Sequence, residues 1–314
     1  MNRYINDYKW SNIFEMVRNL KSEPKMAPDL FSNRLVVITG ATSGIGFATA
    51  QKFASRGADL LFINRNEGKS VELCETIKRE HNVECDFILA DFAKLSDIHH
   101  AAQELNQLEK TIDVFIHNAG VYNTSRILTE DGLEAVFQTN YLSTFILNHT
   151  LKEKFKKQSS GRILFVNSEA YRFAAFGLHM DDLSWTRRRY SGIQSYGSAK
   201  LAQLLSMHKF KEYFADSGVT INAMHPGNVK TNSGQNNGSL YKLFKKWFLD
   251  RSVQPITFAA EALYYLGVSE EVKGRSGIFY NLTTEEEPAP PALDLEAAQQ
   301  LWEISLNLGG LHDQ

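Results

Sequence analysis

The segment from residue 34 to residue 56 constrains the fold most strongly, because it has the pattern of a strand, a glycine turn and a helix. Arg34–Thr39 is apolar and β-branched, which suits a strand buried on both faces. The turn Thr39-Gly40-Ala41-Thr42-Ser43-Gly44-Ile45-Gly46 then runs into a helical pattern at Phe47–Arg56. Its spacing differs from the Gly-x-Gly-x-x-Gly fingerprint, and glycines alone could form a simple turn. The flanking strand and helix favour a pyrophosphate site at the helix N-terminus.

Each glycine has an expected role in that site. Gly40 makes the tight turn, Gly44 lets the backbone approach the phosphates, and Gly46 lets the helix pack on the strand. About twenty residues further on, an NAD site usually presents a carboxylate to the ribose. Here Asn64-Arg65 follows the second predicted strand instead. A guanidinium can bind a 2′-phosphate, which favours NADP(H) over NAD(H). A solvated surface arginine is the competing interpretation.

The rest of the chain alternates strand and helix patterns. Strands are expected at 59–64, 83–90, 112–117, 161–168, 219–224 and 277–281, and helices at 67–80, 95–108, 131–156, 195–216, 256–267 and 294–307. Such alternation predicts an α/β fold, a doubly wound parallel sheet of the Rossmann type with helices on both faces. We expect one domain at 34–282, preceded by a helical extension and connector at 1–33. A connector and helix follow at 283–314.

Composition narrows the function classes. A net charge of −2 over 314 residues argues against nucleic acid as the main partner. The two cysteines, Cys74 and Cys85, have no metal-ligand spacing, so no metal site is predicted, and they fit a reduced cytoplasmic interior. The chain has no signal-peptide pattern at its start and no apolar run of the ~18–20 residues that span a bilayer.

Two amphipathic stretches leave alternatives open. Residues 8–20 or 240–248 could contact a membrane surface, but at 8–20 acidic side chains favour packing on the domain or on a partner subunit. Aromatic and aliphatic residues alternate with lysines at 240–248, within a segment at 228–250 that could be a lid over an apolar substrate or an ordinary packed helix. The basic run 187–189 suits a solvated loop better than an anion site.

Tyr196 and Lys200 are four residues apart in a predicted helix, so both side chains project from one face. A fixed cation beside a phenol favours the phenolate, which suits acid–base work on an alcohol or carbonyl. Such a pair also occurs by chance, and so does an isolated Asn140 in a helix. Ser168 is expected at the carboxyl end of a strand, and Asn118-Ala119-Gly120 at another, where open α/β sheets bind ligands.

With these motifs in this order, residues 34–282 resemble the short-chain dehydrogenase/reductase family. The motifs are TGxxxGxG, NAG, an isolated Asn, a strand-end Ser and YxxxK. The long interval between Ser168 and Tyr196, with the C-terminal half, is most similar to the retinol-dehydrogenase-like (dehydrogenase/reductase member) branch. That branch tends to use NADP(H) and apolar alcohols or carbonyls.

The resemblance implies roles for individual residues. Ser168 would hold the substrate oxygen, Tyr196 would be the general acid or base, and Lys200 would lower its pKa and bind ribose. Asn140 would anchor a water that links Lys200 to solvent. Tyr196 and Lys200 are also expected to contact the cofactor. The other expected cofactor contacts are Gly40, Ser43, Gly44, Ile45, Gly46, Arg65, Asp91, Phe92, Asn118, Ala119, Gly120, Pro226, Gly227, Val229 and Thr231.

The expected function is interconversion of an alcohol and its aldehyde or ketone, on an apolar substrate such as a retinoid, steroid or fatty aldehyde. A dimer or tetramer is implied by the resemblance. The alternative is a regulatory or scaffold protein that binds a nucleotide without catalysis; such proteins characteristically lose the Tyr or the Lys. A sugar epimerase fits less well, since its glycine turn is usually spaced differently. Glu169, after the strand-end serine, is expected to point to solvent.

Overall fold

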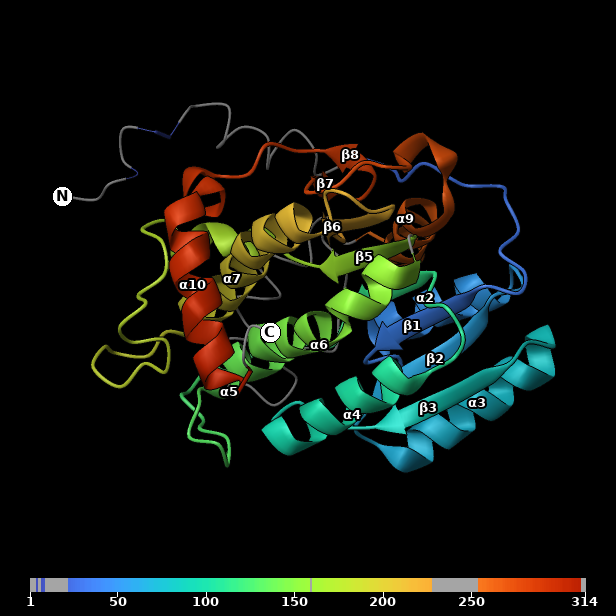
Figure 1. Cartoon of the computed structure of the whole chain (residues 1–314), viewed down its shortest axis with the longest axis horizontal. Coiled ribbons are helices and arrows are strands. Elements are labelled where there is room, and N and C mark those ends of the chain that lie inside the picture. The colour runs from blue at the N-terminus through green and yellow to red at the C-terminus, as the bar shows by residue number, and fades with distance from the viewer. Residues whose placement is uncertain (1–3, 5–6, 9–21, 159, 228–253, 312–314) are drawn as a thin grey trace.

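The computed structural model describes residues 4, 7–8, 22–158, 160–227 and 254–311. Its centre is an eight-stranded sheet in the order β3-β2-β1-β4-β5-β6-β7-β8 (Figure 1). The strands are β1 (Leu35–Thr39), β2 (Asp59–Asn64), β3 (Cys85–Leu89), β4 (Val114–His117), β5 (Gly161–Val166), β6 (Val219–His225), β7 (Phe279–Asn281) and β8 (Thr284–Glu285). Seven strands pair in parallel, as predicted, and the two-residue β8 adds an antiparallel edge. The doubly wound α/β fold is therefore confirmed.

Helices cover both faces of this sheet. The main ones are α2 (Gly44–Ala54), α3 (Glu67–His81), α4 (Leu95–Gln107), α6 (Ser143–Gln158), α7 (Gly192–Tyr213), α9 (Ile256–Val268) and α10 (Leu295–Leu308). Side chains of β1 alternate between two hydrophobic cores: Val37 packs in the core with α4, α6, α7 and α10, and Val36 in the core with α2, α3 and α9. Both faces of β1 are thus buried, as its apolar sequence predicts.

The long helix expected at 131–156 is interrupted. It begins with the single turn α5 (Ala135–Phe137), continues as the π-helical segment η2 (Gln138–Leu142) and only then becomes α6. Asn140 lies inside η2. Short π-helical segments within α-helices occur frequently at functional sites.

The region between β5 and α7 contains the 3₁₀ helix η3 (Glu169–Ala174) followed by a loop. A further 3₁₀ helix, η6 (Glu270–Val272), follows α9, and η7 (Pro290–Leu293) leads into α10. Helix α10 lies along α7 in Figure 1 and carries Trp302, whose ring centroid is 4.9 Å from that of Phe210. The C-terminal helix is therefore part of the core.

Parts of the predicted extension contact the domain. The Tyr4 hydroxyl donates to Asp294 Oδ2 at 2.6 Å, and the Tyr8 hydroxyl to the carbonyl of Ala175 at 3.1 Å. The amphipathic stretches 9–20 and 240–248, and the lid predicted at 228–250, lie outside the described residues. Among the helices that are described, none has the length and apolarity needed to cross a bilayer.

The two cysteines lie close together. Cys74 on α3 and Cys85 on β3 are both buried, and their sulfur atoms are 3.3 Å apart. Both thiols are free, and their contact lies between the edge strand and the helix beside it.

Candidate active site

The glycine turn between β1 and α2 has the close contacts that its sequence predicts. Gly40 has a φ of +71°, and a Cβ there would lie 3.0 Å from the Cα of Ala119. At Gly46 a Cβ would lie 2.3 Å from the carbonyl oxygen of Gly40 and 2.5 Å from Nδ2 of Asn118. Gly46 thus lets the helix pack on the turn and on the Asn118 loop.

The N-terminus of α2 faces open space. A Cβ at Gly44 would meet no atom within 4 Å, although its φ of +63° still favours glycine. The Ser43 side chain makes no capping hydrogen bond, and the first turn of α2 carries no acidic residue. The first amides of a helix have no intrahelical partner and attract anions. The residues present therefore fit a dinucleotide pyrophosphate.

Two asparagines brace this turn. Asn118 Nδ2 donates to the carbonyl oxygens of Thr39 and Gly40 at 3.0 and 2.9 Å. Asn64 Oδ1 accepts from the Ala41 amide at 2.8 Å. The family resemblance implies that Asn118 contacts the cofactor ribose. In the structure its side-chain nitrogen, Nδ2, is hydrogen-bonded to the glycine turn. The contact of Asn64 with the turn was not predicted from the sequence. Its only sign in the sequence is the position of Asn64 at the end of a strand.

The remaining predicted cofactor contacts that the structure describes follow the carboxyl ends of β2, β3 and β6. Arg65 is exposed directly after β2. Asp91 accepts from the Ala93 amide at 3.0 Å, and Phe92 is 6% exposed and packs in the core. Gly227 has a φ of +74° and follows the buried Pro226. Val229 and Thr231 lie outside the described residues.

Tyr196 and Lys200 share one face of α7, as predicted. The Lys200 Nζ lies 5.7 Å from the centroid of the Tyr196 ring and donates to the carbonyl of Val166 at 2.7 Å. Lys200 is 3% exposed, and burial lowers the pKa of its ammonium to about 7. The Tyr196 ring also packs edge to face with the Tyr122 ring, and the two ring centroids are 5.8 Å apart.

Ser168 lies at the end of β5, next to this helix. Its hydroxyl oxygen accepts from the Ala170 amide at 3.2 Å and so caps η3. Helix η3 packs closely on α7, because a Cβ at Gly197 would lie 2.4 Å from the carbonyl oxygen of Ala170. Asn167 Nδ2 also donates to the Lys200 carbonyl at 2.9 Å. The contacts bring the Ser168 segment against the helix of Tyr196 and Lys200.

Asn140 reaches the site through its main chain. Its carboxamide makes two bonds with the backbone of Val121, from Nδ2 at 2.9 Å and to Oδ1 at 2.7 Å. The main-chain carbonyl oxygen of Asn140 accepts from Nε2 of Gln203 at 2.8 Å. The Asn140 side chain therefore holds the loop after Gly120, while its main-chain carbonyl bonds to Gln203 in the middle of α7.

The prediction that the Glu169 side chain points to solvent is wrong. Its side chain is 11% exposed and forms an ion pair with Arg172, which also pairs with Glu286 at 2.8 Å. Burial raises the pKa of Glu169. Arg172 and Glu286 are 114 residues apart in the sequence, so local pattern gave no sign that this position lies in the interior.

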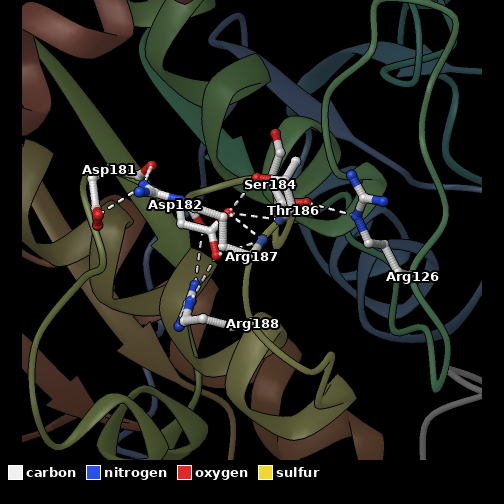
Figure 2. Close-up of polar contacts among 7 residues, drawn as sticks. All are labelled: Arg126, Asp181, Asp182, Ser184, Thr186, Arg187 and Arg188. Carbon is white, nitrogen blue, oxygen red and sulfur yellow. Dashed lines mark hydrogen bonds and ion pairs between the residues drawn. The ribbon is translucent and has the colours of Figure 1, made fainter.

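The basic run belongs to a loop with its own acidic partners (Figure 2). Asp182 accepts from the Thr186 amide at 2.6 Å, from its hydroxyl at 2.7 Å and from Arg188 Nε at 3.0 Å. Arg187, 61% exposed, pairs with Asp181 at 2.7 Å. The prediction of a solvated loop holds for Arg187 but is wrong for Arg188, whose guanidinium lies 4.0 Å from the centroid of the Trp185 ring. Among the described residues, no group of three or more His, Cys, Asp and Glu side chains could hold a metal ion.

Comparison with known proteins agrees with this geometry. Residues 34–180 match the model of the family described as short chain dehydrogenase. The chain is 34% identical to human retinol dehydrogenase 13 over 288 residues, which cover 88% of this chain and 85% of that protein. It is 32% identical to human retinol dehydrogenase 14, with 90% and 88% covered. It is also 31% identical to the human WW domain-containing oxidoreductase, with 88% and 68% covered.

Solved structures show the same fold. An uncharacterised protein of Mycobacterium paratuberculosis matches with a TM-score of 0.71 and 27% identity, over 90% of this chain and 96% of that one. A short-chain dehydrogenase of Sphingobium yanoikuyae, solved with NADPH, matches with a TM-score of 0.61 and 22% identity, over 74% and 83%. Since its sequence is similar over most of its length to several members, this chain belongs to the short-chain dehydrogenase/reductase family.

Proposed function

We propose that the chain is an NADP(H)-dependent oxidoreductase that interconverts an apolar alcohol and its aldehyde or ketone. The observation that carries this proposal is the complete set of Ser168, Tyr196, Lys200 and Asn140 beside an open glycine turn. A fold alone would not support an activity. The alternative, a nucleotide-binding regulatory protein, has less support because all four positions keep their residue types.

The roles follow from chemistry. Ser168 binds the substrate oxygen, and Tyr196 donates a proton to that oxygen in reduction or accepts it in oxidation. Lys200 as a cation stabilises the Tyr196 phenolate and binds the ribose. When bound, the nicotinamide supplies or accepts the hydride, so the protein contributes position and electrostatics.

Tyr196→Phe tests the proton transfer. We expect kcat for reduction of all-trans-retinal by NADPH to fall by ~10²–10⁴-fold, the usual contribution of a positioned general acid. NADPH affinity, measured by calorimetry, should change little. Turnover by the variant at the wild-type rate would contradict the catalytic role. NADPH binding without turnover of retinal or any apolar aldehyde would favour the regulatory alternative.

Arg65→Ala tests the cofactor preference. Loss of a charge-assisted bond to the 2′-phosphate should weaken NADPH binding by roughly 10–100-fold and leave NADH binding nearly unchanged. Arg79→Ala is a matched control, since Arg79 is also exposed and lies in the last turn of α3. Equal losses for NADPH and NADH would remove Arg65 as the basis of the preference.

An apolar substrate is supported by the aromatic ring of Tyr122 against Tyr196 and by the names of the retinol dehydrogenase relatives. Profiling all-trans-retinal, a steroid ketone and decanal against a sugar phosphate checks this part. Preference for the sugar phosphate would overturn it.

A further inference from the structure

Gln203 lies three residues after Lys200 on α7 and has no role in the proton transfer described above. Its side chain is fully buried, with 0% exposure, as is Asn140. Residues three apart on a helix share a face, so Gln203 projects toward the same interior region as Lys200. A buried carboxamide must have partners for its donors and its acceptor.

Two partners of the Gln203 side chain, Asn140 and Lys200, belong to the proposed catalytic set. Its Nε2 donates to the main-chain carbonyl of Asn140 at 2.8 Å, and its Oε1 accepts from Lys200 Nζ at 3.2 Å. A carbonyl can only accept and an ammonium can only donate, so these two partners fix which way the carboxamide faces. Oε1 also accepts from Nδ2 of Asn167 at 3.1 Å.

Asn167 extends this network to the substrate-binding serine. The Asn167 side-chain oxygen, Oδ1, accepts from the Ser168 main-chain amide at 2.8 Å. The main-chain amide of Asn167 donates to the Met224 carbonyl at 2.7 Å. One carboxamide, Gln203, therefore joins the segments that carry Asn140, Lys200 and Ser168.

We propose that Gln203 is a positioning residue whose carboxamide bridges the Asn140 carbonyl and the Lys200 ammonium directly, in a place that a water would otherwise fill. This inference rests on the proposed function. The Gln203 carbonyl dipole points at the ammonium and stabilises its charged form in a buried site. It also holds Nζ at a fixed place relative to the Tyr196 ring. A carboxamide does not exchange protons as water does, so Gln203 acts by orientation.

Two variants separate this role from simple packing. Gln203→Met keeps the size of the side chain but removes both polar ends. Gln203→Ala leaves room for a water, which needs two to four polar partners; Asn140, Lys200 and Asn167 provide three. A space-filling residue would tolerate Met better than Ala. The proposal expects the opposite order: kcat for all-trans-retinal at least roughly tenfold higher in the Ala variant than in the Met variant.

Readouts other than activity complete the test. A crystal structure of the Gln203→Ala protein should show a water within hydrogen-bond distance of Asn140 O and Lys200 Nζ. NADPH affinity should stay within about threefold of wild type in both variants, because the Gln203 side chain is fully buried and bonds to Asn140, Lys200 and Asn167 rather than to the glycine turn. Absence of that water, or kcat for Met equal to or above that for Ala, overturns the inference.

These outcomes are distinguishable from failure of the proposed function. If wild-type protein neither binds NADPH nor reduces retinal, the oxidoreductase proposal fails, while the water in the Ala variant still decides whether the carboxamide replaces it. If the wild type turns over and Tyr196→Phe does not, only the order of the two Gln203 variants is at stake. Should the Met variant fail to fold, the Ala structure decides.

Discussion

Lys200 is a buried cation whose Nζ donates to two neutral groups, the Val166 carbonyl and the Gln203 carboxamide. Desolvation disfavours the charged form, and the pKa of the group falls to about 7. A residue of this kind serves catalysis at a cost to stability.

Lys200→Met should therefore stabilise the protein without cofactor while abolishing turnover. We expect the free energy of unfolding at pH 7 to rise by about 1 kcal/mol or more, and Tm by roughly 2 °C or more. The pKa is lowered in the folded state, so between about pH 7 and 10 the unfolded chain binds the extra proton. Wild-type stability then increases with pH across this window, and the advantage of the variant shrinks.

Thermal unfolding from pH 6 to 10 checks this prediction, with Lys209→Met as the control. Lys209 lies on the same helix in an exposed pair with Glu212, so its loss should change stability by less than about 0.5 kcal/mol at every pH. A destabilised Lys200→Met protein at pH 7 would show that the ammonium has stronger partners than those described.

Residues with a local signal could be predicted from the sequence. Gly40 and Gly46 lie in a turn whose spacing demands close approach, and Tyr196 and Lys200 share a face by helical period. Asn64, Gln203 and Glu169 were missed or wrongly placed, because their roles depend on partners from distant segments. No local pattern encodes such a contact.

At the scale of elements, most helices and strands begin and end close to where the hydrophobic periodicity predicts, but this periodicity did not predict the π-helical segment η2. The Ser143 amide donates to the Gln138 carbonyl five residues earlier, while the Asn140 carbonyl accepts from Gln203. The same apolar spacing is compatible with an uninterrupted α-helix. The partner of the Asn140 carbonyl lies on α7, outside 131–156, so the sequence of that stretch alone gives no sign of this contact.

The loop between η3 and α7 is organised by one carboxylate, Asp182, which is 5% exposed. Asp182→Ala removes the acceptor for the Thr186 amide and hydroxyl and for Arg188, which should loosen the segment that leads from Ser168 to Tyr196. We expect KM for retinal to rise by roughly tenfold, with NADPH affinity unchanged. Steady-state kinetics and calorimetry measure the two effects.

Asp181→Ala is the matched control for that variant. Asp181 is the adjacent residue, its side chain is 73% exposed, and its pair with Arg187 is on the surface. A surface pair contributes little, so KM should stay within about twofold of wild type. Similar effects of both variants would mean that Asp182 does not organise the loop.

At the scale of the whole molecule, α10 closes the core on the outer side of α7. Trp302 is 8% exposed and lies 5.0 Å from Phe145 on α6 and 4.9 Å from Phe210, centroid to centroid. The C-terminal segment, which falls outside the matched range 34–180, is thus part of one packed unit. Dimer or tetramer formation and contact with a membrane stay predictions.

Trp302→Ala should destabilise the protein by about 3–5 kcal/mol, the usual cost of removing a buried tryptophan. Leu295→Ala on the same helix should change stability by less than about 0.5 kcal/mol, because Leu295 is 65% exposed. Denaturant unfolding followed by circular dichroism measures both. Equal, small effects would mean that α10 docks weakly and unfolds separately.

The neighbouring thiols of Cys74 and Cys85 give the molecule a built-in reporter of local opening. They are the two cysteines of the sequence, and both are buried, at 6% and 3% exposure, between α3 and the edge strand β3. A thiol reagent reaches them only when this edge of the sheet separates, so its reaction rate measures the frequency of opening. Since Arg65 lies directly before α3, nucleotide that holds this edge closed should slow the reaction without any introduced label.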